Sequence, residues 1–260
     1  MTAADWNPDL YARFRDLRLQ PAFDLANRIG ALPPGALCDL GCGAGVAGAL
    51  LRERFPGRPL LGLDSSAAML AKAETTGAYD RLEQVDIATW TPEAPLALIY
   101  SNAVLHWLPD HHRLLPHLAS LLAPGGLLAV QMPHQNPAPS HRLWHDLVER
   151  HFPGHFDPST SPGILEPADY FNLLAPLGEL SLWETEYYQR LPAETGGHPV
   201  RLFTSSTFAR PVLDALPPEA ATELCRLYDD AAGHIYPLRA DGSVLFPFRR
   251  LFFVLQAPAM

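Results

Sequence analysis

The sequence predicts an α/β fold built on a doubly wound, mostly parallel sheet. Between residues 36 and 132, short apolar runs alternate with segments of helical periodicity. Three alternating glycines follow the first apolar run, and several later runs end in an acidic or amide side chain. Because strand–helix alternation produces parallel strands with right-handed crossovers, the connecting helices are expected on both faces of the sheet.

The predicted elements begin with one or two amphipathic helices over residues 7–30. Strands are then expected at residues 36–40, 59–64, 81–87, 96–104 and 125–133. Helices are expected between them at residues 44–55, 66–76 and 111–122. Ser65 is expected to cap the second of these helices, because a serine hydroxyl accepts a hydrogen bond from a free N–H group of the first turn.

The pattern changes after Met132, where prolines become frequent. A helix is expected at residues 166–178, a long strand at 179–191, helices within 192–242, and a last strand at 243–256. This order predicts three parts. A core with N-terminal helices occupies residues 1–133, helical cap insertions occupy 134–165 and 192–243, and residues 166–191 and 244–260 return to the core sheet.

Composition restricts the class of protein. The 260 residues, of which 48% are hydrophobic, suit one domain or one domain with a sizeable insertion. The net charge of -9 disfavours a nucleic-acid partner, which needs a positive surface. No apolar run is long enough to cross a bilayer and no secretion signal opens the chain, so we expect a cytoplasmic protein without a membrane partner. The cysteines Cys38, Cys42 and Cys225 form neither a disulfide framework nor a zinc motif.

The glycines Gly41, Gly43 and Gly45 follow the first strand and lead into a helix. Glycine allows positive φ and close approach of another group to the backbone. The pattern G-x-G-x-x-G also occurs here, at Gly43, Gly45 and Gly48, so a dinucleotide site and a simple tight turn are both alternatives. Asp39 argues against a dinucleotide, because a carboxylate there would repel a pyrophosphate. It would attract the sulfonium and ammonium groups of S-adenosylmethionine.

Other polar residues stand at the ends of later strands. Asp64 ends the second strand, where a carboxylate can accept hydrogen bonds from both ribose hydroxyls. The alternative for Asp64 is an acid favoured at a helix start. Asp86 could accept from an adenine amino group while Ile87 and Met69 pack on the ring, although an apolar helix residue such as Met69 is more commonly part of a core. Asn102 ends the fourth strand, where methyl donor and acceptor would meet.

Residues 36–132 resemble class I S-adenosylmethionine-dependent methyltransferases through "LCDLGCGAG", "GLDSS", "VDI" and "SNAVLHW", in that order. The resemblance implies a Rossmann-like sheet of seven strands, with the last two from residues 179–191 and 244–256, and S-adenosyl-L-methionine as cofactor, released as S-adenosyl-L-homocysteine. The cofactor-binding residues that it implies are Tyr11, Asp39, Gly41, Cys42, Gly43, Gly45, Asp64, Ser65, Met69, Asp86, Ile87 and Asn102.

A narrower resemblance, to the family of trans-aconitate 2-methyltransferases, rests on "DWNPDLYARF", "SNAVLHWLPDH", "LLAVQMP", "YYQRLP" and "IYPLRADGSVLFPFRRLFFV". It is weakest at about residues 136–165 and 192–215. It implies methyl-ester formation on a small polycarboxylate by in-line transfer. No catalytic general base is expected, because the acid is already ionised near neutral pH. A monomer or homodimer would bind this substrate through Trp107, Tyr187, Arg210, Tyr236 and Arg250.

Alternative functions differ in cofactor or acceptor. The acceptor could be another small acid or a malonyl thioester, and a non-catalytic S-adenosylmethionine-binding module or an NAD(P)-dependent oxidoreductase also fits the glycine segment. The histidines His141, His145, His151 and His155 have a spacing that could bind a metal. No carboxylate or cysteine pattern accompanies them, so we expect no metal.

Overall fold

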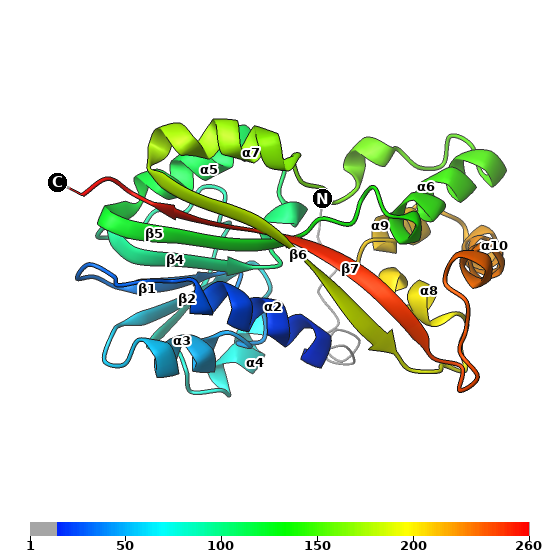
Figure 1. The fold of residues 1–260 in the computed structure, drawn as a ribbon, viewed down its shortest axis with the longest axis horizontal. Helices are drawn as coiled ribbons and strands as arrows, with labels where there is room; N and C mark the ends of the chain where they lie inside the picture. The colour runs from blue at the N-terminus through cyan, green and yellow to red at the C-terminus, as the bar shows by residue number, and fades with distance from the viewer. Residues whose placement is uncertain (1–14, 260) are drawn as a thin grey trace. The chain divides into compact units, whose positions relative to one another are not determined.

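A computed structural model describes residues 15–259 of the chain (Figure 1). The described residues divide into two units, each with more contacts inside it than to the other. Unit 1 comprises residues 15–133, 164–185 and 251–259, and unit 2 comprises residues 134–163 and 186–250. Tyr11, which the sequence assigns to the cofactor site, lies outside the described residues.

The described residues form one seven-stranded sheet in the order β3-β2-β1-β4-β5-β7-β6. The strands are β1 (Leu37–Leu40), β2 (Leu60–Asp64), β3 (Arg81–Gln84), β4 (Leu96–Asn102), β5 (Leu122–Pro133), β6 (Glu179–Leu191) and β7 (Val244–Gln256). β1 pairs in parallel with both β2 and β4, β2 pairs in parallel with β3, and β4 with β5. The chain therefore reverses its direction of travel across the sheet between β1 and β4, and ligands of such sheets bind at the carboxyl ends of the strands there.

The last strand, β7, runs in the opposite direction to its neighbour β5. Ala257, just after β7, donates a hydrogen bond to the carbonyl of Gly126 near the beginning of β5, with an N–O distance of 2.9 Å. The N–H group of Gly125 donates to the carbonyl of Pro258 at 3.2 Å. β7 is thus antiparallel to β5, which confirms the predicted sheet as doubly wound and mostly, but not entirely, parallel.

Helices cover both faces of the sheet in unit 1 (Figure 1). One face carries α2 (Arg15–Asn27), α3 (Gly48–Arg54) and α4 (Ala67–Glu74), and the other carries α5 (His111–Ser120) and α7 (Pro167–Leu174). Short 3-10 turns follow β4 and α7, namely η1 (Leu105–Trp107) and η3 (Ala175–Leu177). The apolar side chains of β4 and β5 are almost all buried between these helices, as the continuous hydrophobic runs in both segments predict.

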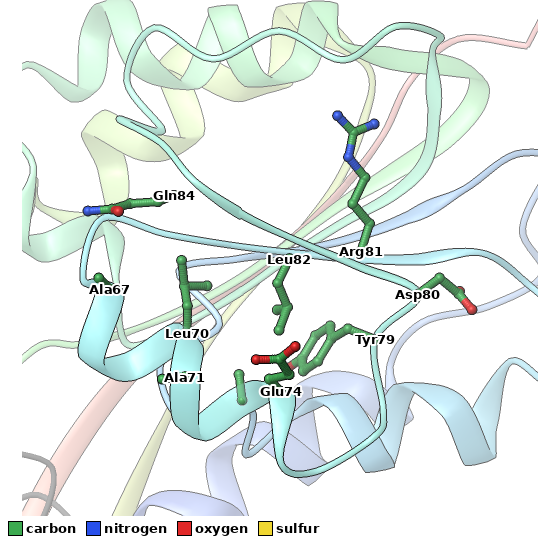
Figure 2. Close-up of a pocket in the computed structure, with 10 residues that line it drawn as sticks. Ala67, Leu70, Ala71, Glu74, Tyr79, Asp80, Arg81, Leu82 and Gln84 are labelled. Carbon is green, nitrogen blue, oxygen red and sulfur yellow. The ribbon is translucent and has the colours of Figure 1, made fainter.

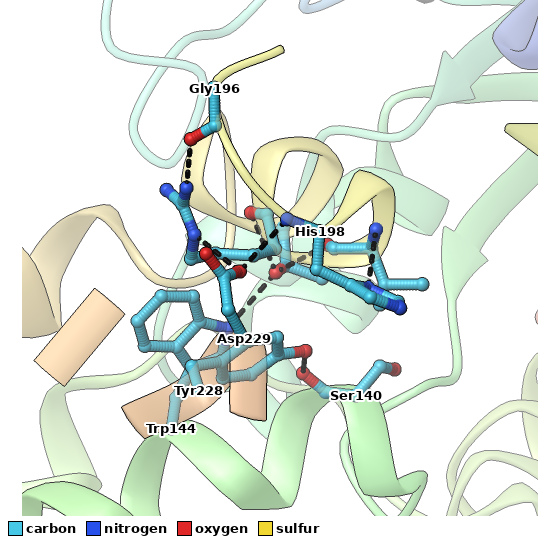
Figure 3. Close-up of polar contacts among 9 residues, drawn as sticks. Ser140, Trp144, Gly196, His198, Tyr228 and Asp229 are labelled. Carbon is cyan, nitrogen blue, oxygen red and sulfur yellow. Dashed lines mark hydrogen bonds and ion pairs between the residues drawn. The ribbon is translucent and has the colours of Figure 1, made fainter. Parts of the chain in front are cut away.

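Unit 2 contains α6 (Pro139–His151), η2 (Pro158–Thr160), α8 (Pro199–Ser205), α9 (Arg210–Asp214) and α10 (Pro218–Ile235). Its core includes Trp144, whose ring stacks on Tyr228 with a centroid distance of 4.2 Å. Figure 3 shows the polar contacts around this pair. The Trp144 indole N–H donates to the Thr204 hydroxyl at 3.0 Å, and the Tyr228 hydroxyl donates to the Ser140 carbonyl at 2.7 Å. These contacts join α6, α8 and α10.

The start of α8 is held by a second group of polar contacts (Figure 3). Nδ1 of His198 accepts the N–H of Val200 at 3.3 Å, and its Nε2 lies 2.9 Å from the carbonyl oxygen of Tyr236. Asp229 on α10 accepts from both the His198 N–H and the Arg201 guanidinium, which also donates to the Gly196 carbonyl. The histidine side chain therefore supplies the acceptor that usually comes from serine or aspartate at a helix start.

Element boundaries differ from the predictions at a few places. The helix predicted from residue 44 begins at Gly48, because residues 41–47 form successive turns that end with the N–H of Gly48 donating to the carbonyl of Gly45. The third strand ends at Gln84 and not at Ile87, because Asp86 turns the chain: its carbonyl accepts the N–H of Trp90 at 3.1 Å. The two late strands have the predicted extent to within one residue.

Candidate functional site

The glycine segment folds back onto the end of β2. The N–H groups of Gly41 and Cys42 both donate to the carbonyl of Leu63, each with an N–O distance of 2.8 Å. This places residues 41–43 at the carboxyl ends of β1 and β2. In a parallel sheet that edge is the binding edge.

Glycine is favoured at positions 41 and 43 for different reasons. A Cβ atom on Gly41, where φ is +76°, would lie 2.4 Å from Cγ1 of Val104. The group that approaches Gly41 closely is therefore part of the protein. A Cβ atom on Gly43, where φ is +54°, would meet no atom of the described residues within 4 Å. No residue between 15 and 259 therefore fills the space beside Gly43 next to the strand ends, which suits a ligand.

Asp64 connects this segment to the start of α4. Its Oδ2 accepts the N–H of Gly43 at 2.8 Å, and its Oδ1 accepts the N–H of Ser66 at 2.9 Å. A carboxylate oxygen can accept more than one hydrogen bond. Each oxygen of Asp64 is therefore held in position by the backbone and retains capacity for a hydroxyl donor.

The serine that caps α4 is Ser66, so the expectation for Ser65 is wrong. The helix begins at Ala67, and the Ser66 hydroxyl accepts the N–H of Met69 at 3.3 Å. Ser65 lies one position too early for this bond and its side chain is exposed, while its carbonyl accepts from the Gln84 amide at 3.0 Å. Met69 is buried on α4, with 5% of its surface exposed.

Asp86 and Ile87 lie in the loop after β3. The Oδ1 atom of Asp86 accepts the N–H of Ala88 at 2.9 Å, and the residue is exposed. Ile87 is buried and belongs to the core of unit 1. The loop therefore exposes the side chain of Asp86 and buries that of Ile87.

Asn102, the last residue of β4, carries a buried amide oxygen that no described residue hydrogen-bonds. The following residue, Ala103, has φ of +59°, a left-handed conformation that is unfavourable for alanine. Its N–H donates to the carbonyl of Gln131 at 2.8 Å, which holds the turn. A buried acceptor without a donor is costly, so the Asn102 oxygen is suited to an N–H or O–H donor from a ligand.

Asp39 lies beneath the glycine segment and is 2% exposed. Its Oδ2 accepts a hydrogen bond from the Tyr79 hydroxyl, with an O–O distance of 2.6 Å. Burial raises the pKa of Asp39 to about 7, while the hydrogen bond from Tyr79 lowers it and the charge of Asp64 raises it further. Burial also raises the pKa of the Cys42 thiol, so that thiol stays protonated.

The residues predicted to bind the substrate lie in both units. Trp107 ends η1 in unit 1. In unit 2, Tyr187 is half-buried on β6, and the Arg210 guanidinium lies 3.7 Å from the carboxylate of Asp214 on the same helix. The Tyr236 hydroxyl accepts the N–H of Ser140 at 3.1 Å.

Arg250 is the most buried cation among these candidates. Only 3% of its surface is exposed, and its guanidinium carbon lies 4.7 Å from the ring centroid of Phe248. The Phe248 ring packs on Phe246, which packs on Tyr236, with centroid distances of 5.7 Å and 5.5 Å. A row of aromatic rings in unit 2 therefore connects two of the predicted substrate residues.

The histidines on α6 pack against aromatic rings. The ring of His141 lies 4.2 Å from that of Phe208, and Nε2 of His145 lies 2.8 Å from the Ser161 hydroxyl. Burial lowers the pKa of His141 to about 3, and the neighbouring His145 lowers it further, so its ring is neutral. Within residues 15–259, no three His, Cys, Asp or Glu side chains gather in an arrangement that could hold a metal ion.

A pocket of about 520 Å³ opens between α4 and the edge strand β3 (Figure 2). Leu70 and Leu82 form its apolar floor, and Glu74, Arg81 and Gln84 are among its polar lining residues. None of the residues predicted to bind cofactor or substrate lines it. The strand-end site described above therefore remains the better candidate.

Two contacts at the site were missed at the level of sequence. One is Tyr79, the partner of Asp39. The other is His111, whose Nε2 lies 2.8 Å from the carbonyl of Leu105 in η1 and whose Nδ1 lies 2.5 Å from the Tyr170 hydroxyl. This pair holds the turn that carries Trp107. Tyr79 belongs to none of the quoted motifs, and His111 ends the segment "SNAVLHWLPDH" without a role assigned to it, so only the three-dimensional contacts identify both.

Comparison with known proteins identifies the family. A protein-family model described as a methyltransferase domain matches residues 11–169, more than half of the chain. The chain belongs to the methyltransferase family. It is therefore a transferase that uses S-adenosyl-L-methionine, and this confirms the predicted cofactor and class of enzyme.

Three relatives of this methyltransferase match it over nearly their full length, and each is named trans-aconitate 2-methyltransferase. The relative from Methylobacterium radiotolerans is 43% identical over 97% of this chain and 98% of its own. That from Paracidovorax citrulli is 38% identical over 98% of this chain and 99% of its own. That from Escherichia coli O1:K1 / APEC is 37% identical, with 97% and 98% covered.

Solved structures share the fold. The YcgJ protein from Bacillus subtilis has a TM-score of 0.61 with 12% identity, over 93% of this chain and 99% of that one. Phosphoethanolamine N-methyltransferase 2 from Haemonchus contortus, solved with S-adenosyl-L-methionine, has a TM-score of 0.53 with 15% identity, over 93% of this chain and 53% of that one. These likenesses confirm the fold class.

The described residues fit S-adenosylmethionine. No described residue fills the space at Gly43 or donates a hydrogen bond to the Asn102 oxygen, and an ammonium group would provide that donor. The oriented carboxylate of Asp64 suits hydroxyl donors, and Asp39 and Asp64 together make the site negative. No helix within the described part of the chain is long and apolar enough to cross a membrane.

Proposed function

We propose that this methyltransferase esterifies trans-aconitate, moving a methyl group from S-adenosylmethionine to one of its carboxylates. The observation that carries the proposal is the similarity to relatives named trans-aconitate 2-methyltransferase, at 37% to 43% identity over at least 97% of the chain. The similarity extends through unit 2, most of which, residues 186–250, lies outside the region that the methyltransferase domain model matches.

For the cofactor, we propose one role for each strand end. Asp64 accepts from the ribose hydroxyls, Asp86 accepts from the adenine amino group, and Asn102 accepts from the ammonium group. Ile87 and Met69 pack on adenine. The other cofactor-binding residues that we propose in this part of the chain are Gly41, Cys42, Gly43, Gly45 and Ser65. The charge of Asp39 favours a cationic ligand. When bound, S-adenosylmethionine supplies a methyl group on a positively charged sulfur atom.

For the acceptor, we propose that residues 134–165 and 192–243 select the acid. Arg250 and Arg210 bind its carboxylates, because a guanidinium binds a carboxylate through two parallel hydrogen bonds. The buried Arg250 is the stronger candidate, since its guanidinium lies over the Phe248 ring, whereas Arg210 is only half-buried and its guanidinium lies near the carboxylate of Asp214. Tyr187 and Tyr236 add hydroxyl groups, and Trp107 excludes water next to Asn102. No side chain needs to remove a proton.

The proposal extends to the setting of the reaction. We expect a monomer or homodimer that acts in the cytoplasm on a free small acid, with neither nucleic acid nor membrane as partner. The free thiols of Cys38, Cys42 and Cys225 support a reducing compartment, where disulfides are rare.

Transfer of a labelled methyl group tests the substrate directly. The purified protein is given labelled S-adenosylmethionine with trans-aconitate, cis-aconitate, isocitrate or a malonyl thioester, and base-labile ester is counted. The proposal expects the highest kcat/KM with trans-aconitate. A higher value with another acid would replace the substrate, and cofactor binding without ester on any acid would contradict the proposal.

The role of Arg250 has its own test. Arg250→Gln is expected to raise the KM for trans-aconitate at least tenfold, since a charge-assisted hydrogen bond to a carboxylate contributes about 1.5–3 kcal/mol. Its affinity for S-adenosylmethionine should stay within twofold of wild type. The control Arg226→Gln removes an exposed arginine that pairs with Glu223 and Asp230 on α10 and should leave both constants unchanged. Equal effects of the two substitutions would exclude the proposed role.

A further inference from the structure

Tyr79 makes a contact that the methyl-transfer reaction does not explain. It lies between α4 and β3, and its hydroxyl donates to Oδ2 of Asp39 at 2.6 Å, across 40 positions of sequence. Among the described side chains, Tyr79 is the one that hydrogen-bonds the Asp39 carboxylate. The contact fixes the direction of a carboxylate that is 2% exposed.

The chain makes space for this ring with glycines. A Cβ atom on Gly48 would lie 2.7 Å from Cζ of Tyr79, and one on Gly62 would lie 2.8 Å from its Cδ1. A Cβ atom on Gly45 would lie 3.2 Å from its Cε2. Gly48 and Gly62 belong to α3 and β2, where glycine is unfavourable compared with alanine. Two elements therefore give up local stability to seat one tyrosine.

This packing also explains the third glycine of the G-x-G-x-x-G pattern. In dinucleotide-binding proteins that position allows close packing of helix and strand. Here Gly48 instead faces the Tyr79 ring, which Figure 2 shows beside Leu82 at one end of the pocket. The third glycine of the pattern is therefore explained by packing against Tyr79 and does not indicate a pyrophosphate site.

Burial and one neighbouring charge oppose the ionisation of Asp39, and one hydrogen bond favours it. Its titratable neighbours are Asp64, the thiols of Cys38 and Cys42, and the hydroxyls of Tyr79 and Tyr100. Burial and the charge of Asp64 disfavour the ionised carboxylate, whereas the Tyr79 hydrogen bond favours it. The opposing groups are fixed by the fold, so the hydroxyl of Tyr79 sets how much of Asp39 is charged near neutral pH.

We propose that Tyr79 is a positioning residue of the cofactor site: it orients Asp39 and keeps it negatively charged beneath the glycine segment, so that the positively charged cofactor binds at neutral pH. The proposal rests on the proposed role of Asp39 in cofactor binding. Tyr79 acts through Asp39, and no contact between Tyr79 and the cofactor is required.

The test is the pH dependence of cofactor binding by Tyr79→Phe, measured by calorimetry with S-adenosylmethionine between pH 6 and 9. The phenyl ring still fills the space, so the fold should be retained. We expect the affinity at pH 7 to fall about tenfold and to recover toward wild type at pH 9, because a hydrogen bond to a charged group is lost and Asp39 needs a higher pH to ionise. The midpoint of the binding curve against pH should move up by about one unit.

Tyr100→Phe is the matched control. Tyr100 is a fully buried tyrosine of unit 1, whereas Tyr79 is half-buried. The Tyr100 hydroxyl donates to the carbonyl of Ala22, at 2.8 Å, and not to Asp39. Its midpoint should equal that of wild type. An unchanged midpoint in Tyr79→Phe, or equal shifts in both variants, would overturn the proposal.

A second readout uses the protein without cofactor. The carboxylic acid band of Asp39, assigned by its loss in Asp39→Asn, is followed by infrared spectroscopy against pH. It should persist to higher pH in Tyr79→Phe than in wild type, and persistence to the same pH contradicts the proposal. If Tyr79→Phe does not fold, Asp39→Asn decides, because its binding should be weak and independent of pH. A wild-type protein that binds the cofactor but forms no ester contradicts the proposed substrate alone.

Discussion

The Asp64 carboxylate binds two backbone segments at once, the glycine segment through Gly43 and the start of α4 through Ser66. Asparagine has one acceptor oxygen where aspartate has two, so Asp64→Asn can keep only one of these bonds. We expect the Kd for S-adenosylmethionine, measured by calorimetry, to rise about 10- to 100-fold. Asp80→Asn is the control: Asp80 accepts the N–H of Leu60 at 2.7 Å, at the opposite end of β2. An equal loss in both variants would show that Asp64 acts only through stability.

The two glycines of the turn should respond differently to alanine. Gly41→Ala introduces both a left-handed alanine and a clash with Val104, so the free energy of unfolding in urea should fall by about 2–4 kcal/mol. Gly43→Ala introduces only the backbone strain and should lose about 1–2 kcal/mol. Its main effect should be weaker binding of S-adenosylmethionine. Equal losses of stability would contradict the assignment of Gly41 to packing and Gly43 to the ligand.

The sequence predicts that Asp39, Asp64 and Asp86 lie near the carboxyl ends of strands, because position along a parallel strand determines the edge at which a side chain lies, and the structure places all three near that edge. Sequence reasoning did not find Tyr79, because that residue reaches Asp39 from 40 positions away. The prediction of Ser65 as the cap of α4, in place of Ser66, was wrong for a related reason. Two adjacent serines are equivalent as caps until the first turn of the helix is known.

At the scale of the element, the buried His141 makes the stability of α6 depend on pH. Its ring is neutral in the folded protein, where burial lowers its pKa from 6.5 to about 3, and binds a proton below pH 6.5 once unfolded. The stability that it contributes is therefore present above pH 6.5 and is lost as the pH falls. His141→Phe keeps an aromatic ring against Phe208 without this proton.

The urea unfolding free energy of His141→Phe, relative to wild type, should thus increase by about 1 kcal/mol between pH 6.5 and pH 5.5. His155→Gln, which changes an exposed histidine after α6, should show no such increase. A constant difference between His141→Phe and wild type across this range would mean that His141 binds protons equally in the folded and the unfolded protein.

The elements were predicted best where one kind of evidence dominates. β6 and β7 have the predicted extent to within one residue, because turn residues stand close to both ends of each segment. β4 and β5 were predicted as strands from their apolar runs, but β4 ends two residues and β5 begins three residues before the predicted limits, at Asn102 and Leu122. β3 was predicted too long, because Val85 and Ile87 continue an apolar pattern after the ladder has ended at Gln84. Ile87 is buried as the pattern requires, but it is buried from a loop.

At the scale of the whole molecule, cofactor binding should stabilise unit 1 in particular. A ligand at 100 times its Kd stabilises the native state by about 2.7 kcal/mol. Hydrogen exchange with saturating S-adenosylmethionine should therefore slow at the amides of residues 41–45 and 64–66, which form the candidate site. NAD at the same concentration should leave them unchanged. Protection by NAD, or protection confined to residues 134–163, would contradict the site.

The order of the strands has a consequence for synthesis. β1 to β5 come from residues up to 133 and are consecutive neighbours in the sheet, and of these five strands β5 is the one that also pairs with a later strand, β7. β6, at the sheet edge, has β7 as its neighbour, and β7 is the last strand to leave the ribosome. Strands β1 to β5 can thus pair while translation continues. The backbone groups of β6 stay unpaired until more than fifty further residues have been made and β7 follows. A premature stop codon before residue 244 would consequently leave β6 without its neighbouring strand and β5 as an unpaired edge, and both would be open to aggregation or proteolysis.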